Sequence, residues 1–448
     1  MSETWTAERI LALAPDASSA KSGRELANAR KWQKLGHDER SAWGLCQGSG
    51  ANPYQTQIDL SEPAFKCSCP SRKFPCKHGL GLFLLLAGTQ GAFTENTRPA
   101  WVDEWLSKRT QKTEEKSKKR EDAAAEPVDP AAAQKRQAAR EKKVAGGLKE
   151  IELWLHDLVR QGLAAVQTRP YAFWESAAAR MVDAQCPGVA RLVREMGATA
   201  SSGAGWDKRL LRDLARLHLL VEGYKRIEML PAETQADLRS LVGFPVDQDR
   251  LLGQAGMRDV WFVAAQRVEM EDRLRVQRTW MIGGASGRTA LLLQFAHGTT
   301  AFATQVLPGA TVNAELVLFP SALPMRALIK ARHDSPRAVD AGRVGYESIE
   351  SARAGYAEAL AKFPWLEKFG MALRAVTPQR LGEAWHLVDA QGDALAVTPR
   401  FARPWHLAAG SGGKPVWVFG EFDGDFLLPL SMIAEDGLSL LVTGGDEP

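Results

Sequence analysis

One short segment constrains the fold of this chain more than any other part of it. Cys67, Cys69, Cys76 and His78 follow one another in the spacing C-x-C-x6-C-x-H. Three thiolates and one imidazole are the ligand set of a closed, tetrahedral zinc site, in which no position is left for a substrate or a reactive water molecule. The segment therefore predicts one structural Zn²⁺ and a small domain that folds around it.

Other uses of these cysteines fit the sequence less well. A bridge between Cys67 and Cys69 would close a strained ring, and a bridge from either of them to Cys76 needs an oxidising compartment. Free cysteines are often buried without a ligand, but the lysine, serine and arginine neighbours in this segment are poorly suited to a core. A redox role or an inert, buried role stays as the alternative to zinc.

The segment and its surroundings resemble the SWIM-type zinc finger. The family pattern C-x-C-x(n)-C-x-H is met without departure by Cys67, Cys69, Cys76 and His78. The Gly-rich run 44–50, the strand through Tyr54 and the Leu-rich stretch after the histidine also resemble bacterial SWIM proteins of similar length, over about residues 1–106. The resemblance implies a strand-strand-zinc-helix fold, binding of DNA or of a protein, and no catalytic chemistry.

The resemblance also implies a kind of partner. Such proteins are commonly encoded beside MoxR-type AAA+ ATPases and von Willebrand A-domain proteins, so a protein of one of these two kinds is expected. The charge distribution leaves nucleic acid open as well. Residues 1–143 carry 24 basic and 18 acidic side chains, whereas residues 144–448 carry 33 and 35. A surface that faces a polyanion is therefore expected near the N-terminus, although the imbalance is mild.

Basic residues lie among the expected zinc ligands and are the candidate contacts to a nucleic acid or a partner protein. They are Lys66, Arg72, Lys73 and Lys77. Phe74 lies between them and could stack on a base, but a small zinc domain has few apolar residues, which favours a place in its core. A solvated face is the alternative for the charged residues.

The rest of the chain divides into regions of different composition. Residues 1–106 are expected to form the zinc module, with a helix over 23–35, a strand over 54–60 and a helix over 77–86. Residues 107–145 are rich in Lys, Arg, Glu and Ala, poor in large apolar residues and interrupted by Pro127 and Pro130. They predict a charged, flexible linker.

Helices and strands are expected in separate regions after the linker. Apolar residues at helical spacing, such as Leu148, Ile151 and Leu155, predict a helical domain over residues 146–248. Residues 249–448 contain short β-rich runs bounded by turns and one amphipathic helix over 347–363, without regular βαβ alternation. The fold class is therefore α+β: a small ββα-type zinc finger, a charged linker, a helical domain and a strand-rich antiparallel C-terminal domain.

Taken together, the sequence predicts a non-enzymatic adaptor whose finger binds a partner, with protein favoured over DNA. The run 410–415 lacks the spacing of a phosphate-binding loop and is expected to form a hairpin loop. No catalytic spacing occurs in residues 249–448, so an enzyme with an unrecognised site there is the competing class. No apolar run is long enough to span a membrane and no signal peptide is evident, which favours the cytoplasm.

Overall fold

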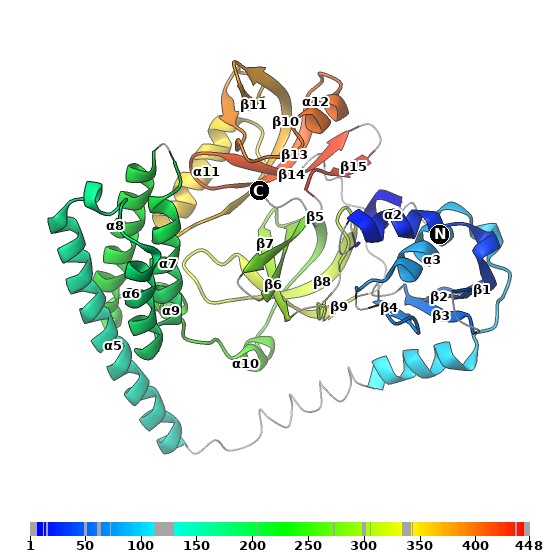
Figure 1. The fold of residues 1–448 in the computed structure, drawn as a ribbon, viewed down its shortest axis with the longest axis horizontal. Helices are drawn as coiled ribbons and strands as arrows, with labels where there is room; N and C mark the ends of the chain where they lie inside the picture. The colour runs from blue at the N-terminus through cyan, green and yellow to red at the C-terminus, as the bar shows by residue number, and fades with distance from the viewer. Residues whose placement is uncertain are drawn as a thin grey trace.

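The computed structural model shows a zinc module, a helical bundle, a β-barrel and an open sheet (Figure 1). It describes residues 7–11, 13–14, 17–48, 52–60, 64–71, 73–111, 130–203, 205–271, 274–297, 302–304, 306–333, 342, 344–434 and 437–442. The class is α+β, with sheets that are mainly antiparallel, as the sequence predicts.

The N-terminal module is a four-stranded antiparallel sheet covered by helices. Its strands pair in chain order and are β1 (Trp32–His37), β2 (Ser41–Cys46), β3 (Tyr54–Asp59) and β4 (Ala64–Cys67). Short helices α1 (Ala7–Leu11) and α2 (Ala17–Leu26), the 3-10 turns Ala29–Lys31 and Gln90–Ala92, and α3 (Lys77–Gly88) complete it, together with a helical segment at 100–111. Helix α3 is buried continuously from His78 to Leu86, so it forms the centre of this core.

The helix expected over residues 23–35 is wrong beyond Leu26. Helix α2 ends at Leu26, and residues 32–37 form the edge strand β1. Trp32 and Leu35 are buried in the module's core, and β1 pairs with β2. Tertiary pairing and burial therefore override a local pattern that looked helical.

The next region is a bundle of helices. They are α5 (Pro130–Gln161), α6 (Tyr171–Asp183), α7 (Pro187–Ala200), α8 (Trp206–Lys225), α9 (Ala232–Val242) and the short α10 (Gln248–Leu252), with 3-10 turns at Leu163–Ala165 and Ile227–Met229. Helix α5 crosses the boundary expected at 145/146. Pro130 stands at its first position, where the missing N–H costs nothing, so this proline begins a helix instead of breaking one. Residues 112–129 of the expected linker, including Pro127, lie outside the described residues.

A closed barrel follows the bundle. Its strands β5 (Met257–Glu271), β6 (Leu274–Gly283), β7 (Thr289–His297), β8 (Thr311–Leu318) and β9 (Arg326–Arg332) close in the order β5-β6-β7-β9-β8. All neighbours are antiparallel except β7 and β9, which are parallel. Trp261, Met281 and Leu292 belong to the cluster that fills the interior.

The C-terminal sheet packs on the outside of this barrel (Figure 1). It contains β10 (Phe369–Leu381), β11 (Ala384–Val388), β12 (Ala394–Ala396), β13 (Val416–Phe422), β14 (Leu427–Ala434) and β15 (Gly437–Leu440), in the order β12-β11-β10-β13-β14-β15. Strand β13 is buried on both faces. Trp417 and Phe419 pack against the barrel, whereas Val416 and Val418 pack against the cluster that includes α11 (Ile349–Lys362) and α12 (Pro404–Ser411).

The loop expected over residues 410–415 is corrected by the structure. Gly410 and Ser411 end helix α12, and Gly412 and Gly413 have positive φ angles of 58° and 74°, which glycine adopts readily. The segment is therefore a helix end followed by a tight turn into β13, not a hairpin loop between two strands.

Candidate metal centre

Two of the four predicted ligands lie at the C-terminal end of β4, and the other two lie at the N-terminal end of α3. Cys67 is the last residue of β4, and Cys69 follows in the turn after it. Cys76 is the N-cap residue of α3, and His78 lies in the first turn of that helix. Backbone pairing positions Cys67 and Cys69, since N of Ser68 between them donates to the Gln55 carbonyl at 2.9 Å. Burial of α3 positions Cys76 and His78.

Their distances fit tetrahedral zinc. One ligand atom from each of Cys67, Cys69, Cys76 and His78 lies within 4.8 Å of the other three. Nδ1 of His78 is 3.8 Å from Sγ of Cys67 and 4.0 Å from Sγ of Cys76. A zinc ion with Zn–S bonds of about 2.3 Å separates its ligand atoms by about 3.8 Å along each edge of the tetrahedron. The sequence prediction that these residues form one cluster is therefore confirmed.

The cluster favours a thiolate at Cys76. Hydrogen bonding with Cys67 lowers the pKa of the Cys76 thiol, and hydrogen bonds with His78 and the Gly79 N–H act in the same direction. The same hydrogen bond between Cys67 and Cys76 raises the pKa of Cys67, so Cys76 loses its proton first. Because Cys76 caps the N-terminus of α3, the positive end of the helix dipole also stabilises its negative charge. A thiolate is the form that binds zinc.

Two residues that support the ligands were not found by sequence reasoning. Oγ1 of Thr56 lies 3.2 Å from Sγ of Cys67, directly across the ladder between β3 and β4. The ring of Tyr54 packs on the ring of His78, with centroids 5.0 Å apart. The alternation of polar and apolar residues predicts the strand that contains both residues. Only the pairing register shows which of its side chains contact the ligands.

The predicted binding residues lie around the cluster. Lys66, Lys73 and Lys77 are exposed, and Arg72 lies outside the described residues. Phe74 is partly buried, packs on the core of the module and meets Phe65 edge to face at 6.2 Å. This placement agrees with the core role expected for Phe74. The three lysines are therefore exposed beside the metal ligands, whereas Phe74 packs in the core of the module.

The remaining cysteines have structural positions. Cys46 is fully buried in the core of the zinc module, and Cys186 is fully buried in the bundle at the N-terminus of α7. Burial raises the pKa of both thiols, to about 11 for Cys186. Neither one joins the metal cluster.

Among the helices that the structure describes, none has the length and apolar character to cross a bilayer.

Comparison with known families agrees with this geometry. Residues 54–87 match the SWIM zinc finger, and residues 139–242 match the SWIM-associated four-helix bundle domain. The first span holds β3, β4 and all four ligands, and the second ends with α9. Neither a search of curated proteins nor a search of solved structures gave a match. The chain therefore carries a SWIM zinc finger that holds one structural Zn²⁺, followed by a SWIM-associated four-helix bundle domain.

Proposed function

We propose that this chain is a zinc-dependent adaptor without catalytic activity, whose finger presents a folded surface to a partner. The observation that carries the proposal is the closed ligand set of Cys67, Cys69, Cys76 and His78. Four protein ligands fill the coordination sphere of zinc, so the ion organises the finger and does not bind a substrate. A surface that exists only when zinc is bound is suited to recognition.

A protein partner is favoured over nucleic acid. The bacterial SWIM proteins that the sequence resembles suggest a MoxR-type AAA+ ATPase or a von Willebrand A-domain protein. The basic surface of the finger is also small. The pKa of Glu104 is lowered mainly by Lys108 and more weakly by Lys66. Glu104 therefore lies near Lys66, one of the three exposed lysines. Lys108 compensates the charge of Glu104 in an ion pair, so this part of the surface adds little net positive charge that could attract phosphate groups.

Nucleic-acid binding is the second candidate, and the exposure of Lys66, Lys73 and Lys77 favours it. Three lysines on a rigid finger can each neutralise one phosphate group. Each contact contributes about −0.9 to the slope of log K against log salt concentration on duplex DNA, so three contribute up to about −2.7. Loss of that much slope on neutralising the three lysines identifies this mode of binding.

Partner capture with the full chain tests the first proposal. We expect a MoxR-type ATPase or von Willebrand A-domain protein from the source genome to be retained by the zinc-loaded protein after nuclease treatment. The Cys76→Ser/His78→Ala variant should lose it because the finger no longer folds. Retention by that variant contradicts a zinc-dependent adaptor. The matched control Cys46→Ala changes a buried thiol outside the cluster and should retain the partner.

Fluorescence anisotropy with labelled duplex DNA tests the second proposal. The variant Lys66→Gln/Lys73→Gln/Lys77→Gln is compared with Lys142→Gln/Lys149→Gln/Lys208→Gln, which removes three exposed lysines from the bundle. Weak binding that both variants reduce equally rejects the finger as a DNA-binding surface. A reduction of the salt slope only in the finger variant supports it.

A further inference from the structure

A cavity of about 250 Å³ lies where the helical bundle meets the C-terminal sheet. Residues of α7, α8 and α9 line one side of it, and Trp365, Glu367 and Asp423 line the other. Hydrogen bonds join the two walls directly. Nε1 of Trp365 donates to the carbonyl of Arg216 at 2.8 Å, and Nη2 of Arg216 donates to the carbonyl of Leu366 at 3.2 Å. The cavity is therefore formed by two parts of the chain that are held together.

Carboxylates outnumber cations around this cavity. Glu195, Asp213, Glu367 and Asp423 line it, and Asp425 joins them through its ion pair with Arg212. The guanidinium groups beside them are those of Arg191, Arg212 and Arg216. Five carboxylates against three guanidinium groups give a formal charge of −2. The site can therefore accept positive charge.

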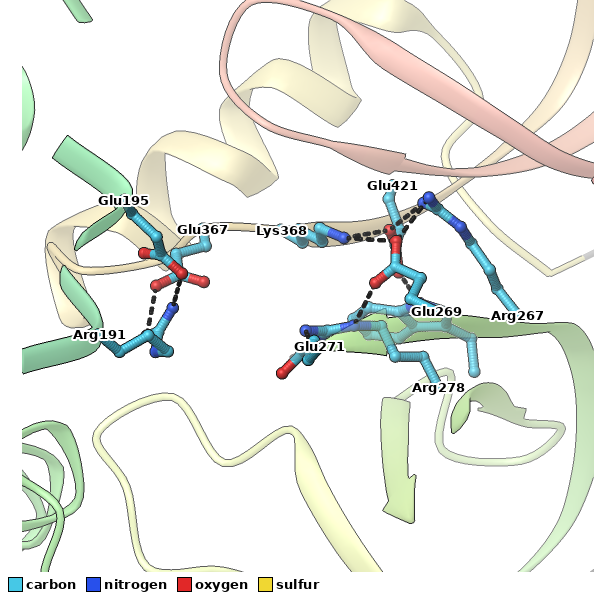
Figure 2. Close-up of polar contacts among 10 residues, drawn as sticks. Arg191, Glu195, Arg267, Glu269, Glu271, Arg278, Glu367, Lys368 and Glu421 are labelled. Atoms are coloured by element: carbon cyan, nitrogen blue, oxygen red, sulfur yellow. Dashed lines mark hydrogen bonds and ion pairs between the residues drawn. The ribbon is translucent and has the colours of Figure 1, made fainter. Parts of the chain in front are cut away.

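The available cations are shared among several partners. Figure 2 shows Glu195 and Glu367 converging on the single guanidinium of Arg191, at 2.6 and 2.8 Å. Arg212 is 3.3 Å from Asp213 and 3.7 Å from Asp425. Arg216 directs Nη2 to a backbone carbonyl. These contacts leave the carboxylates of the cavity incompletely neutralised.

Apart from Thr199, whose hydroxyl donates to Oδ2 of Asp213 at 3.3 Å, the remaining lining is apolar. Leu192, Met196, Leu217, Leu241 and Trp365 provide it. An apolar wall beside an excess of carboxylates suits an organic cation that has a short hydrocarbon stem. The volume is below the roughly 300–1,000 Å³ of sites for drug-sized ligands, so one side chain or one short diamine fits better than a larger molecule.

We propose that this cavity binds the ammonium or guanidinium group of an organic cation on a short apolar stem, in a site separate from the zinc finger. Such a group is supplied either by a free diamine or by a Lys or Arg side chain of a partner protein. The stem packs between the apolar residues, and the cation lies against Asp213 and Asp423. Because both walls contact it, the ligand stabilises the bundle against the C-terminal sheet.

Isothermal titration calorimetry of the full, zinc-loaded chain tests this proposal. The probes are 1,4-diaminobutane, N-acetyl-lysine N-methylamide and N-acetyl-arginine N-methylamide, with butyrate as an anionic control. We expect at least one cation to bind and butyrate not to bind. Asp213→Asn and Asp423→Asn should each weaken binding of the cation about tenfold, because each removes a charged hydrogen-bond acceptor. Asp183→Asn, on the exposed face of α6, should bind as the wild type does.

The relative affinities separate the two sources of the cation. Tighter binding of the diamine identifies a free amine, and tighter binding of a capped amino acid identifies a side chain of a partner. Asp423→Asn should fold normally, because an Asn side chain can still accept the hydrogen bonds that Asp423 receives from the N–H groups of Asp425 and Phe426. Absence of binding by all three cations, or binding that Asp423→Asn leaves unchanged, overturns the proposal.

Discussion

Trp280 of the barrel and Glu421 of the C-terminal sheet are joined by a hydrogen bond, in which Nε1 of Trp280 donates to Oε1 of Glu421 at 2.8 Å. Both residues are almost fully buried. Nζ of Lys368 lies 3.3 Å from the other carboxylate oxygen, and Arg267 lies 3.8 Å from it (Figure 2). The interface between barrel and sheet is therefore apolar at Phe262 and Trp417 and ionic around the buried Glu421.

This hydrogen bond should stabilise the C-terminal half. Trp280→Phe removes the donor and leaves the buried Glu421 carboxylate with fewer partners, which costs about 1–3 kcal/mol of the free energy of unfolding. Urea denaturation followed by circular dichroism measures the loss. Trp405→Phe changes a tryptophan that is 66% exposed and should alter stability by less than about 0.5 kcal/mol. Equal losses for both variants would show that the hydrogen bond is unimportant.

Zinc removal should unfold the finger and leave the rest of the chain folded. The ligands Cys67, Cys69, Cys76 and His78 surround the ion, whereas the bundle, barrel and sheet have their own apolar cores. We expect a chelator to expose amide protons of β3, β4 and α3 to exchange while those of β5 and β6 stay protected. Hydrogen exchange with mass spectrometry measures this difference. Loss of protection in both regions together would contradict an independent finger.

Metal content distinguishes a ligand from a nearby thiol. Cys76→Ser should reduce bound zinc well below one ion per chain, because it removes one of four ligands. Cys46→Ala should keep one zinc ion per chain, although it shortens a buried side chain in the same core. Elemental analysis of the dialysed proteins measures both values.

The zinc site was predictable from the sequence because its ligands are close together in the chain. C-x-C places two thiols at the end of β4 and in the turn after it, and C-x-H places the other two ligands at the N-cap and in the first turn of α3. The support from Thr56 was not predictable, since it depends on the register between β3 and β4. The edge strand β1 was also missed, because burial of Trp32 and Leu35 is a tertiary effect.

Local sequence patterns predict even less of the C-terminal half. Short runs such as 260–265 and 416–422 predict strands, but nothing local indicates that β7 pairs with β9 to close a barrel. Trp280 and Glu421 are 141 residues apart, and their hydrogen bond requires the barrel and the sheet to be complete. Interactions at this separation depend on the whole fold, so periodicity and composition do not reveal them.

The barrel should lose stability in acid through Asp259. This carboxylate accepts hydrogen bonds from the N–H groups of Ala285 and Ser286 in the turn between β6 and β7. Burial alone raises the pKa of Asp259, but hydrogen bonds from Ser286 and neighbouring N–H groups outweigh it, so the pKa in the folded state is lowered. The stabilisation is therefore complete above the unfolded pKa of about 3.9 and is lost as the pH falls through the lower, folded value.

Asp259→Asn tests that assignment. The neutral amide accepts fewer of these hydrogen bonds, so we expect a loss of about 1–3 kcal/mol at pH 7. The difference between variant and wild type should begin to shrink below about pH 4, where the carboxyl of the unfolded chain becomes protonated, and should be smallest below the lower, folded pKa. Urea titrations at several pH values measure the difference. A constant difference from pH 7 to pH 2 would exclude Asp259 as the titrating group.

The ion pair between Arg191 of the bundle and Glu367, by contrast, should contribute little to stability. The two side chains are 2.8 Å apart but 44% and 45% exposed, so water screens their attraction. A double-mutant cycle with Arg191→Ala and Glu367→Ala should give a coupling free energy below about 1 kcal/mol.

Trp365→Phe should cost more than either alanine substitution at this interface. It removes the hydrogen bond from Nε1 of Trp365 to the Arg216 carbonyl, and Trp365 is only 8% exposed. The carbonyl is then left with fewer partners in a partly buried position, which costs about 1–3 kcal/mol. Denaturation midpoints of the four variants and the wild type measure both effects. A larger coupling at the exposed ion pair than the loss at Trp365 would show that charge, and not burial, holds the bundle to the sheet.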